Sequence, residues 1–128
     1  MRAKVKVVSV AILAVVIAGT TASTAVAGQS PAATTVTIRA QGTDLSGAVS
    51  SPAPLRCARN RTVHVYKQIG PRGGGNDIHF ASDTTSLQGS TYRWSTGNTG
   101  TPGYFYSKVL PKTGCRGDTS VTIRVLPT

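Results

Sequence analysis

The sequence predicts an all-β fold, a β-sandwich of about seven strands in a single domain. After residue 27, apolar and polar residues alternate with period two between clusters rich in Gly, Pro, Asn and Ser, which is typical of short strands joined by turns. The same region lacks apolar residues at the i, i+3, i+4 and i+7 spacing of an amphipathic helix. About seven short strands in roughly 100 residues indicate two packed antiparallel sheets.

The first 27 residues have the layout of a secretory signal peptide. Arg2, Lys4 and Lys6 precede an apolar run from Val7 to Ala18, and small residues then lead to an A-x-A cleavage pattern at 25–27. The apolar run is too short to cross a bilayer core as a helix. We therefore expect a secreted protein, extracellular or associated with the cell wall, with no transmembrane segment in its mature form.

Three parts of the chain are expected: a signal peptide at 1–27, a flexible tail at 28–34 and one β-sandwich domain at 35–128. Gly70–Asp77, with Pro71 and three consecutive glycines, must be a loop, and Pro111–Gly117 another. Alternation places the strands at residues 35–39, 45–49, 62–66, 78–80, 92–94, 104–110 and 121–125.

The alternation also assigns the side chains that face the core. Trp94, the only tryptophan, is expected in the core with an acceptor for its indole N–H. The polar stretch Asp83–Gly89 is expected to be a connection without strand structure. The inward set is Val36, Ile38, Leu45, Val49, Val63, Val65, Ile78, Phe80, Trp94, Val121, Ile123 and Val125.

The two cysteines, Cys57 and Cys115, are expected to form a disulfide, because an even cysteine count in an exported chain favours pairing. They lie 58 residues apart, and closing a loop of that length stabilises the fold by about 4 kcal/mol in the chain-entropy description. Two separate buried thiols fit poorly with export. A structural zinc site would require four ligands.

The chain is strongly basic. Three of its 14 lysines and arginines precede residue 28, so eleven remain against four aspartates and no glutamate, a net charge of +7 for residues 28–128. A cationic exported domain is attracted to anionic cell-wall polymers, lipid head groups or nucleic acid. The alternative is that the excess charge only maintains solubility.

Short motifs follow the expected strands. They are Leu45-Ser46-Gly47-Ala48-Val49, Cys57, Arg61-Thr62-Val63-His64-Val65-Tyr66-Lys67, Asp83…Gly89…Tyr92-Arg93-Trp94, Pro102-Gly103-Tyr104-Phe105-Tyr106-Ser107-Lys108-Val109 and Cys115. Together they are similar to bacterial secreted domains with a prealbumin-like fold: the transthyretin-like, carboxypeptidase regulatory-like β-sandwiches, especially short actinobacterial forms. The resemblance covers about residues 43–126. It implies a seven-stranded Greek-key sandwich with an accessory, structural or binding role, and it transfers no catalytic residue. Asp83–Gly89 is longer than the tight Asp-x-x-Gly turn of these domains.

Catalytic, cofactor and metal sites are not expected. A hairpin centred near residues 73–74 would place His64 opposite Asp83 and beside Ser82, but no nucleophile elbow accompanies this possible triad. His64, His79, Asp77 and Asp83 could gather around one strand pair without a recognisable metal-ligand spacing. Gly73–Asp77 lacks the alternating carboxylates of a calcium loop.

Two tripeptides match recognition sequences. Arg116-Gly117-Asp118 spells a motif that some adhesion receptors recognise, although Gly117 is equally a turn residue. Asn60-Arg61-Thr62 fits a glycosylation acceptor, which matters only in a eukaryotic secretory route.

The expected disulfide would bring the two cysteine-bearing segments together and so gather their basic residues into one cluster. Its members are Arg56, Arg59, Arg61, Lys112 and Arg116. Five cations at one end of the sandwich would bind a polyanion through charge-assisted contacts, the alternative being a solvated basic rim. Nucleic acid is not expected as the partner, because no recognition motif or stacking platform accompanies the charge.

The sequence thus favours a secreted, monomeric, non-enzymatic structural or binding module that interacts with an anionic cell-envelope polymer or an extracellular protein. The alternative is a secreted inhibitor or toxin-like effector that acts through the loop Lys112–Asp118 beside the disulfide.

Overall fold

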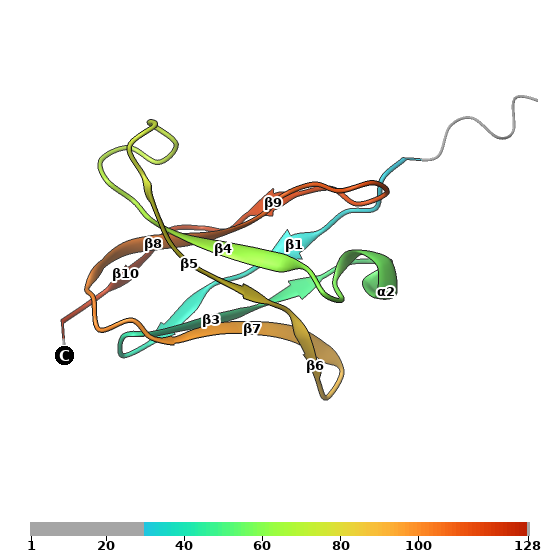
Figure 1. The fold of residues 1–128 in the computed structure, drawn as a ribbon, viewed down its shortest axis with the longest axis horizontal. Helices are drawn as coiled ribbons and strands as arrows, with labels where there is room; N and C mark the ends of the chain where they lie inside the picture. Colours follow the sequence, from blue (N-terminus) through green and yellow to red (C-terminus); the bar gives the residue numbers. More distant parts are fainter. Residues whose placement is uncertain (1–29, 128) are drawn as a thin grey trace, which may run out of the picture. The chain divides into compact units, whose positions relative to one another are not determined.

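The computed structural model describes residues 30–127, and those from Pro31 onward belong to one compact unit. The expected signal peptide lies outside the described residues. The unit is built mostly of β-strands in two antiparallel sheets, which pack face to face as two layers in Figure 1. This arrangement agrees with the all-β, sandwich-like architecture that the alternating pattern predicted.

One sheet has the order β1-β3-β7-β6, with β2 also pairing with β3. The edge of β3 is shared, because β1 pairs with its last two residues and β2 with its first three. The bounds are β1 Thr35–Val36, β2 Arg39–Gln41, β3 Asp44–Ser50, β6 Ser86–Gln88 and β7 Thr91–Asn98.

The other sheet has the order β10-β8-β4-β5, with β9 also pairing with β8. Here the edge of β8 is shared, because β9 and β10 pair with its opposite ends. The bounds are β4 Thr62–Lys67, β5 Ile78–Thr84, β8 Gly103–Val109, β9 Asp118–Thr119 and β10 Ile123–Val125.

The described residues therefore form ten short strands where the alternation suggested about seven longer ones. The expected strand at 35–39 is divided between β1 and β2. The last one begins only at Ile123, and β9 precedes it inside the stretch that had no strand assigned. β6 adds a strand within Asp83–Gly89, which the sequence pattern assigned to a connection.

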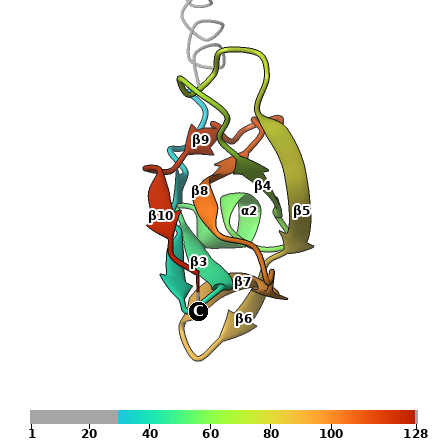
Figure 2. The ribbon, with the colours of Figure 1, turned by 90° about the vertical axis from the view of Figure 1, so that its left-hand side faces the viewer.

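A short helix, α2 (Pro54–Cys57), was missed by the sequence pattern. Pro54 at its first position suits a helix start, because proline has the required φ and the missing N–H would have no partner there. α2 lies in the connection from β3 to β4, which crosses from one sheet to the other. Figures 1 and 2 show α2 between the layers at one end of the sandwich, and Figure 1 shows the β4–β5 loop extending beyond the other end.

The core contains most of the predicted inward set. Phe80 and Ile123 pack against it while only partly buried. The sequence pattern did not single out Phe105 and Val109 of β8, which are fully covered. The predicted residues that are buried are Val36, Ile38, Leu45, Val49, Val63, Val65, Trp94 and Val125.

Two predicted core residues are wrong. Ile78 is 52% exposed because it pairs with Lys67 where the β4–β5 ladder reaches the loop, beyond the buried stretch. Val121 is 70% exposed, and its neighbour Ser120 turns inward instead. The Ser120 hydroxyl accepts the backbone N–H of Ser107 at 2.8 Å, so this polar side chain satisfies β8 where the edge strand is interrupted.

Part of the expected flexible tail is ordered. Ala32 donates its N–H to the carbonyl of Gly114 at 3.0 Å, and Ser51 donates its hydroxyl to the carbonyl of Ala33 at 2.6 Å. Thr34 is buried. These contacts connect residues 32–34 to the sandwich, whose first strand begins at Thr35.

Trp94 depends on a glycine opposite it. Gly47 pairs with Trp94 across β3 and β7, and the indole N–H donates to the carbonyl of Thr37 at 3.1 Å. A Cβ at Gly47 would lie 2.0 Å from that carbonyl oxygen and 2.7 Å from the indole nitrogen. The expected acceptor for the indole is thus present, and Gly47 leaves room for it.

Replacing Gly47 by alanine should lower the free energy of unfolding by about 2 kcal/mol or more, because the added methyl group displaces the indole or the backbone at Thr37. Urea unfolding followed by the fluorescence of Trp94 would measure the change. The matched control is Ala48→Ser on the outward side of the same strand, with an expected effect within about 0.5 kcal/mol. Equal stability of G47A and the unsubstituted chain would contradict the packing argument.

Candidate functional site

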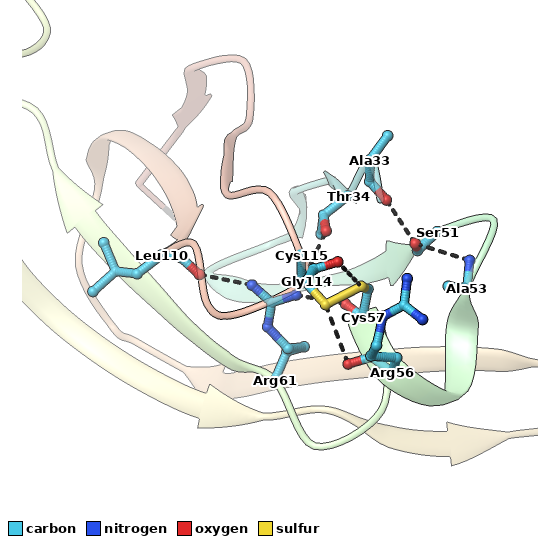
Figure 3. Close-up of a disulfide and its surroundings, with 10 residues drawn as sticks. All are labelled: Ala33, Thr34, Ser51, Ala53, Arg56, Cys57, Arg61, Leu110, Gly114 and Cys115. Carbon is cyan, nitrogen blue, oxygen red and sulfur yellow. Dashed lines mark hydrogen bonds between the residues drawn. A yellow bond between two sulfur atoms is a disulfide. The ribbon is translucent and has the colours of Figure 1, made fainter. Parts of the chain in front are cut away.

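The Cys57–Cys115 disulfide joins the connection from β3 to β4, which crosses between the sheets, to the connection from β8 to β9, which are paired strands of the second sheet. Cys57 ends α2, and Cys115 lies in the connection from β8 to β9; their Cα atoms are 5.4 Å apart and both residues are buried. Figure 3 shows the bridge with its surroundings. The pairing predicted from the cysteine count is confirmed, and it brings together segments 58 residues apart in the sequence.

Backbone hydrogen bonds fix the segment around Cys115. Lys112 and Cys115 exchange two of them, at 3.1 and 2.9 Å, which makes residues 112–115 a tight turn. Ala32 accepts the N–H of Arg116 at 2.9 Å and donates to Gly114, so the start of the sandwich runs beside the turn. The side chains at this end therefore project from a closely tied backbone.

Four of the five predicted cations are exposed around the disulfide. Arg56 and Arg59 come from α2 and the residues just after it, and Lys112 and Arg116 lie on either side of Cys115. The Arg56 side chain lies against Gly114, because a Cβ there would be 3.2 Å from its Nε. The two basic segments are thus in contact through Arg56. We call these four residues the basic end.

Arg61 is not part of this surface. It is only 3% exposed, and its guanidinium donates to the carbonyl oxygens of Cys57 and Leu110, both at 2.7 Å. A third donation reaches the hydroxyl of Thr34 at 3.5 Å. Burial lowers the pKa of the Arg61 guanidinium from its ordinary value. Its prediction as an anion-binding residue is corrected: it ties three segments together from inside.

The sequence held a signal for this interior position. Arg61 precedes Val63 and Val65 at the same period of two, which places it on the inward face of the strand. Its backbone is anchored there as well, since Arg61 and the buried Thr85 exchange hydrogen bonds at 2.9 Å. The charge of arginine led to a surface assignment, whereas the alternation placed it inside.

Three of the four aspartates are engaged by backbone amides. Asp118 accepts the N–H of Val36 at 2.8 Å, and Asp83 accepts that of Ser95 at 2.8 Å. Asp77 accepts the N–H groups of Ile69 and Gly73, both at 3.0 Å. The few negative charges thus hold the scaffold together, and the exposed positive charge dominates the surface.

The two histidines meet on the outer face of the second sheet. His64 Nδ1 lies 3.0 Å from His79 Nε2. Desolvation lowers the pKa of His64, with further lowering by His79 and Lys108, which favours the neutral imidazole. His64 pairs with Ser82, one residue from the predicted partner Asp83.

The structure does not assemble the possible triad. Asp83 pairs with the inward-facing Val63, and its carboxylate reaches across to β7. His64 lies on the opposite face of the strand, because its neighbours Val63 and Val65 are buried. Asp83 therefore cannot orient His64.

A second polar cluster covers the outer face of β8. Tyr106 donates its hydroxyl to Asp77 at 2.6 Å and stacks on Tyr66, with ring centroids 5.5 Å apart. The guanidinium of Arg72 lies 5.2 Å from the centroid of the Tyr106 ring. The hydrogen bond from Tyr106, followed by those from the backbone, lowers the pKa of Asp77. Burial, followed by the hydrogen bond to Asp77, raises the pKa of Tyr106 to about 12. The sequence analysis left this cluster unassigned.

The two tripeptides differ in accessibility. Asp118 of Arg116-Gly117-Asp118 already binds the backbone of Val36. A Cβ at Gly117 would lie 2.6 Å from the carbonyl oxygen of Val109, so this residue packs against the sheet. The motif is therefore not presented as a free loop. Asn60 is exposed in a turn with a positive φ of 53°.

No family model matches the chain, and no curated protein matches it. Among residues 30–127, no helix is long and apolar enough to cross a membrane.

Replacing Arg61 by methionine should lower the free energy of unfolding by about 3 kcal/mol, because two buried carbonyl oxygens lose charged donors. Arg59→Met, at the exposed neighbouring arginine, is the matched control and should change stability by no more than about 0.5 kcal/mol. Urea denaturation of both variants with the disulfide intact would measure this. Similar stabilities for the two variants would show that Arg61 does not have this structural role.

Tyr106 should give the fold an alkaline limit. Its pKa in the folded chain, about 12, exceeds the ordinary value near 10, so its stabilising effect is complete below about pH 10 and is lost as the pH rises through about 12. Absorbance titration near 295 nm should show one tyrosine that ionises near pH 12, and Tyr106→Phe should remove that step. Its persistence in Y106F would contradict the assignment.

Proposed function

We propose that this chain is a secreted, non-enzymatic β-sandwich module that binds an anionic polymer of the cell envelope through its basic end. The observation that carries the proposal is the exposure of Arg56, Arg59, Lys112 and Arg116 on two segments that a disulfide fastens together. Four cations on a tied backbone lose little conformational freedom in the backbone when they bind.

A repeating polyanion suits this surface better than a small ligand. The cations come from two neighbouring segments, so a chain with regularly spaced negative groups can contact several of them at once. A pocket of about 260 Å³ lies beside α2, but Ser50, Ser51, Pro54 and neighbouring uncharged residues line it, and none of the four cations does. The binding surface is accordingly an exposed rim.

Export supports an envelope target. The N-terminal segment has the sequence layout of a signal peptide, and a disulfide is stable in the oxidising space outside the cytoplasm. An exported cationic domain meets the anionic polymers of the envelope first.

The fold proposal is the prealbumin-like, transthyretin-like or carboxypeptidase regulatory-like class, as a Greek-key sandwich. Two features support it. The chain passes between the sheets three times, from β3 to β4, from β5 to β6 and from β7 to β8. Two strands share one edge in each sheet, which reduces the ten strands to eight positions, close to the number in such domains. The resemblance of the motifs adds to these features.

Replacing all four cations of the basic end by serine should reduce retention of the full chain on purified bacterial cell wall by about tenfold or more, because several charge-assisted contacts are lost together. Retention of the unsubstituted chain should also fall as sodium chloride is raised from 50 to 300 mM. Sedimentation of wall with bound protein would measure both effects. Arg61 stays unchanged in this variant, because its loss would disturb the fold.

The matched control removes the same charge elsewhere, with Arg39, Lys67, Arg93 and Arg124 each replaced by serine. It should retain most of the binding. Equal losses of retention in both variants would show that binding depends on net charge rather than on the basic end. If neither salt nor either variant changed retention, the proposal that the chain binds an anionic polymer would be rejected.

The tied turn at residues 112–115, in which Lys112 and Thr113 are exposed, supports the second candidate, a secreted inhibitor or effector. Unaffected wall binding together with micromolar inhibition of a secreted protease would select this candidate.

A further inference from the structure

The fold brings together the only two histidines of the chain. They are 15 residues apart in the sequence and lie on adjacent strands, with His64 on β4 and His79 on β5. Their facing ring nitrogens, Nδ1 of His64 and Nε2 of His79, are 3.0 Å apart. The pair lies on the outer face of the sheet, where His79 is exposed and His64 is half-buried.

A β-bulge produces this contact. Val65 pairs with Ala81, but Tyr66 pairs with His79, so Phe80 is an extra residue in β5. Without the bulge, Phe80 would oppose Tyr66 on the outer face and His79 would turn inward. With it, Phe80 packs on Phe105 in the core, with centroids 5.1 Å apart, and His79 faces outward next to His64.

The spacing of the two nitrogens fits a shared metal ion. Two metal–nitrogen bonds of about 2.0–2.1 Å at about 90–110° to each other place the nitrogens about 2.8–3.4 Å apart. The observed 3.0 Å lies in this range. A hydrogen bond between neutral imidazoles explains the same distance, and a metal would replace it once each ring carries its proton on the outer nitrogen.

The surroundings hold the ring of His79 in place. Tyr66 meets this ring edge to face, with centroids 5.4 Å apart, and is itself stacked on Tyr106. Both histidines are on paired strands rather than on the loop, so their backbone loses little conformational freedom when a metal ion binds. Lys108, which pairs with His64 in register, is the nearby charge that opposes a bound cation.

We propose that His64 and His79 form a two-histidine chelating site for a divalent transition metal, with Cu²⁺ bound in preference to Zn²⁺. No group of three or more His, Cys, Asp or Glu residues forms within the described part of the chain. The protein therefore supplies two nitrogens, and water or an anion from solution completes the coordination. This site is separate from the basic end and does not depend on its function.

The test is titration of the full, untagged chain with Cu²⁺ alone, followed by calorimetry and by electron paramagnetic resonance. We expect one ion per chain with hyperfine splitting from two nitrogens. His64→Gln and His79→Gln should each weaken binding by about 100-fold and leave a single-nitrogen pattern, because a chelate loses its second, intramolecular contact. The variant with both histidines replaced by glutamine measures Cu²⁺ binding elsewhere in the chain, and this background is subtracted from the other titrations.

Lys108→Met serves as a variant that keeps both ligands. Removing its charge should strengthen Cu²⁺ binding by about threefold at low ionic strength. Single-nitrogen splitting in the unsubstituted chain, or a loss of only about twofold in each single variant, would show two independent histidines and overturn the proposal. If a glutamine variant fails to fold, the splitting in the unsubstituted chain still shows whether one or two nitrogens bind the copper ion.

Discussion

The fold depends on one tie at the end of the sandwich, where the Cys57–Cys115 disulfide and the buried Arg61 guanidinium act together. The disulfide joins α2 to the turn after β8, and Arg61 binds carbonyl oxygens of the same two connections at 2.7 Å. Covalent closure limits the unfolded chain, whereas the guanidinium satisfies carbonyl groups that would otherwise be buried without partners. The exposed arginines and Lys112 project from this fixed frame. Binding at these residues therefore depends on the buried Arg61, which holds the frame together without contacting the surface.

Alternation of apolar residues was sufficient to predict the all-β class and most of the core, and the cysteine count predicted the disulfide. It failed at two positions: Ile78 is exposed where the β4–β5 ladder reaches the loop, and Ser120 takes the inward place expected for Val121. The pattern also carries no information on partners distant in sequence. The bond from Tyr106 to Asp77 forms where the β4–β5 loop folds over a strand, and only the three-dimensional arrangement shows it.

The acidic and basic side chains of the domain have different structural roles. Asp77, Asp83 and Asp118 accept hydrogen bonds from backbone amides, which leaves the cations of the surface to face solvent. These three carboxylates accept hydrogen bonds from backbone N–H groups at the ends of loops and strands. This explains how a protein of this size remains ordered at a high net positive charge, since the repulsion is spread over exposed side chains.

Two of these aspartates have a consequence for how copies of the protein behave at high concentration. Asp118 of β9 reaches Val36 of β1, and Asp83 of β5 reaches Ser95 of β7, so one carboxylate links the layers at each open flank. Amides at the margin of a sheet would otherwise invite a strand from a neighbouring molecule. Because these amides are already paired and like charge surrounds them, the flanks discourage fibre-like stacking of neighbouring molecules.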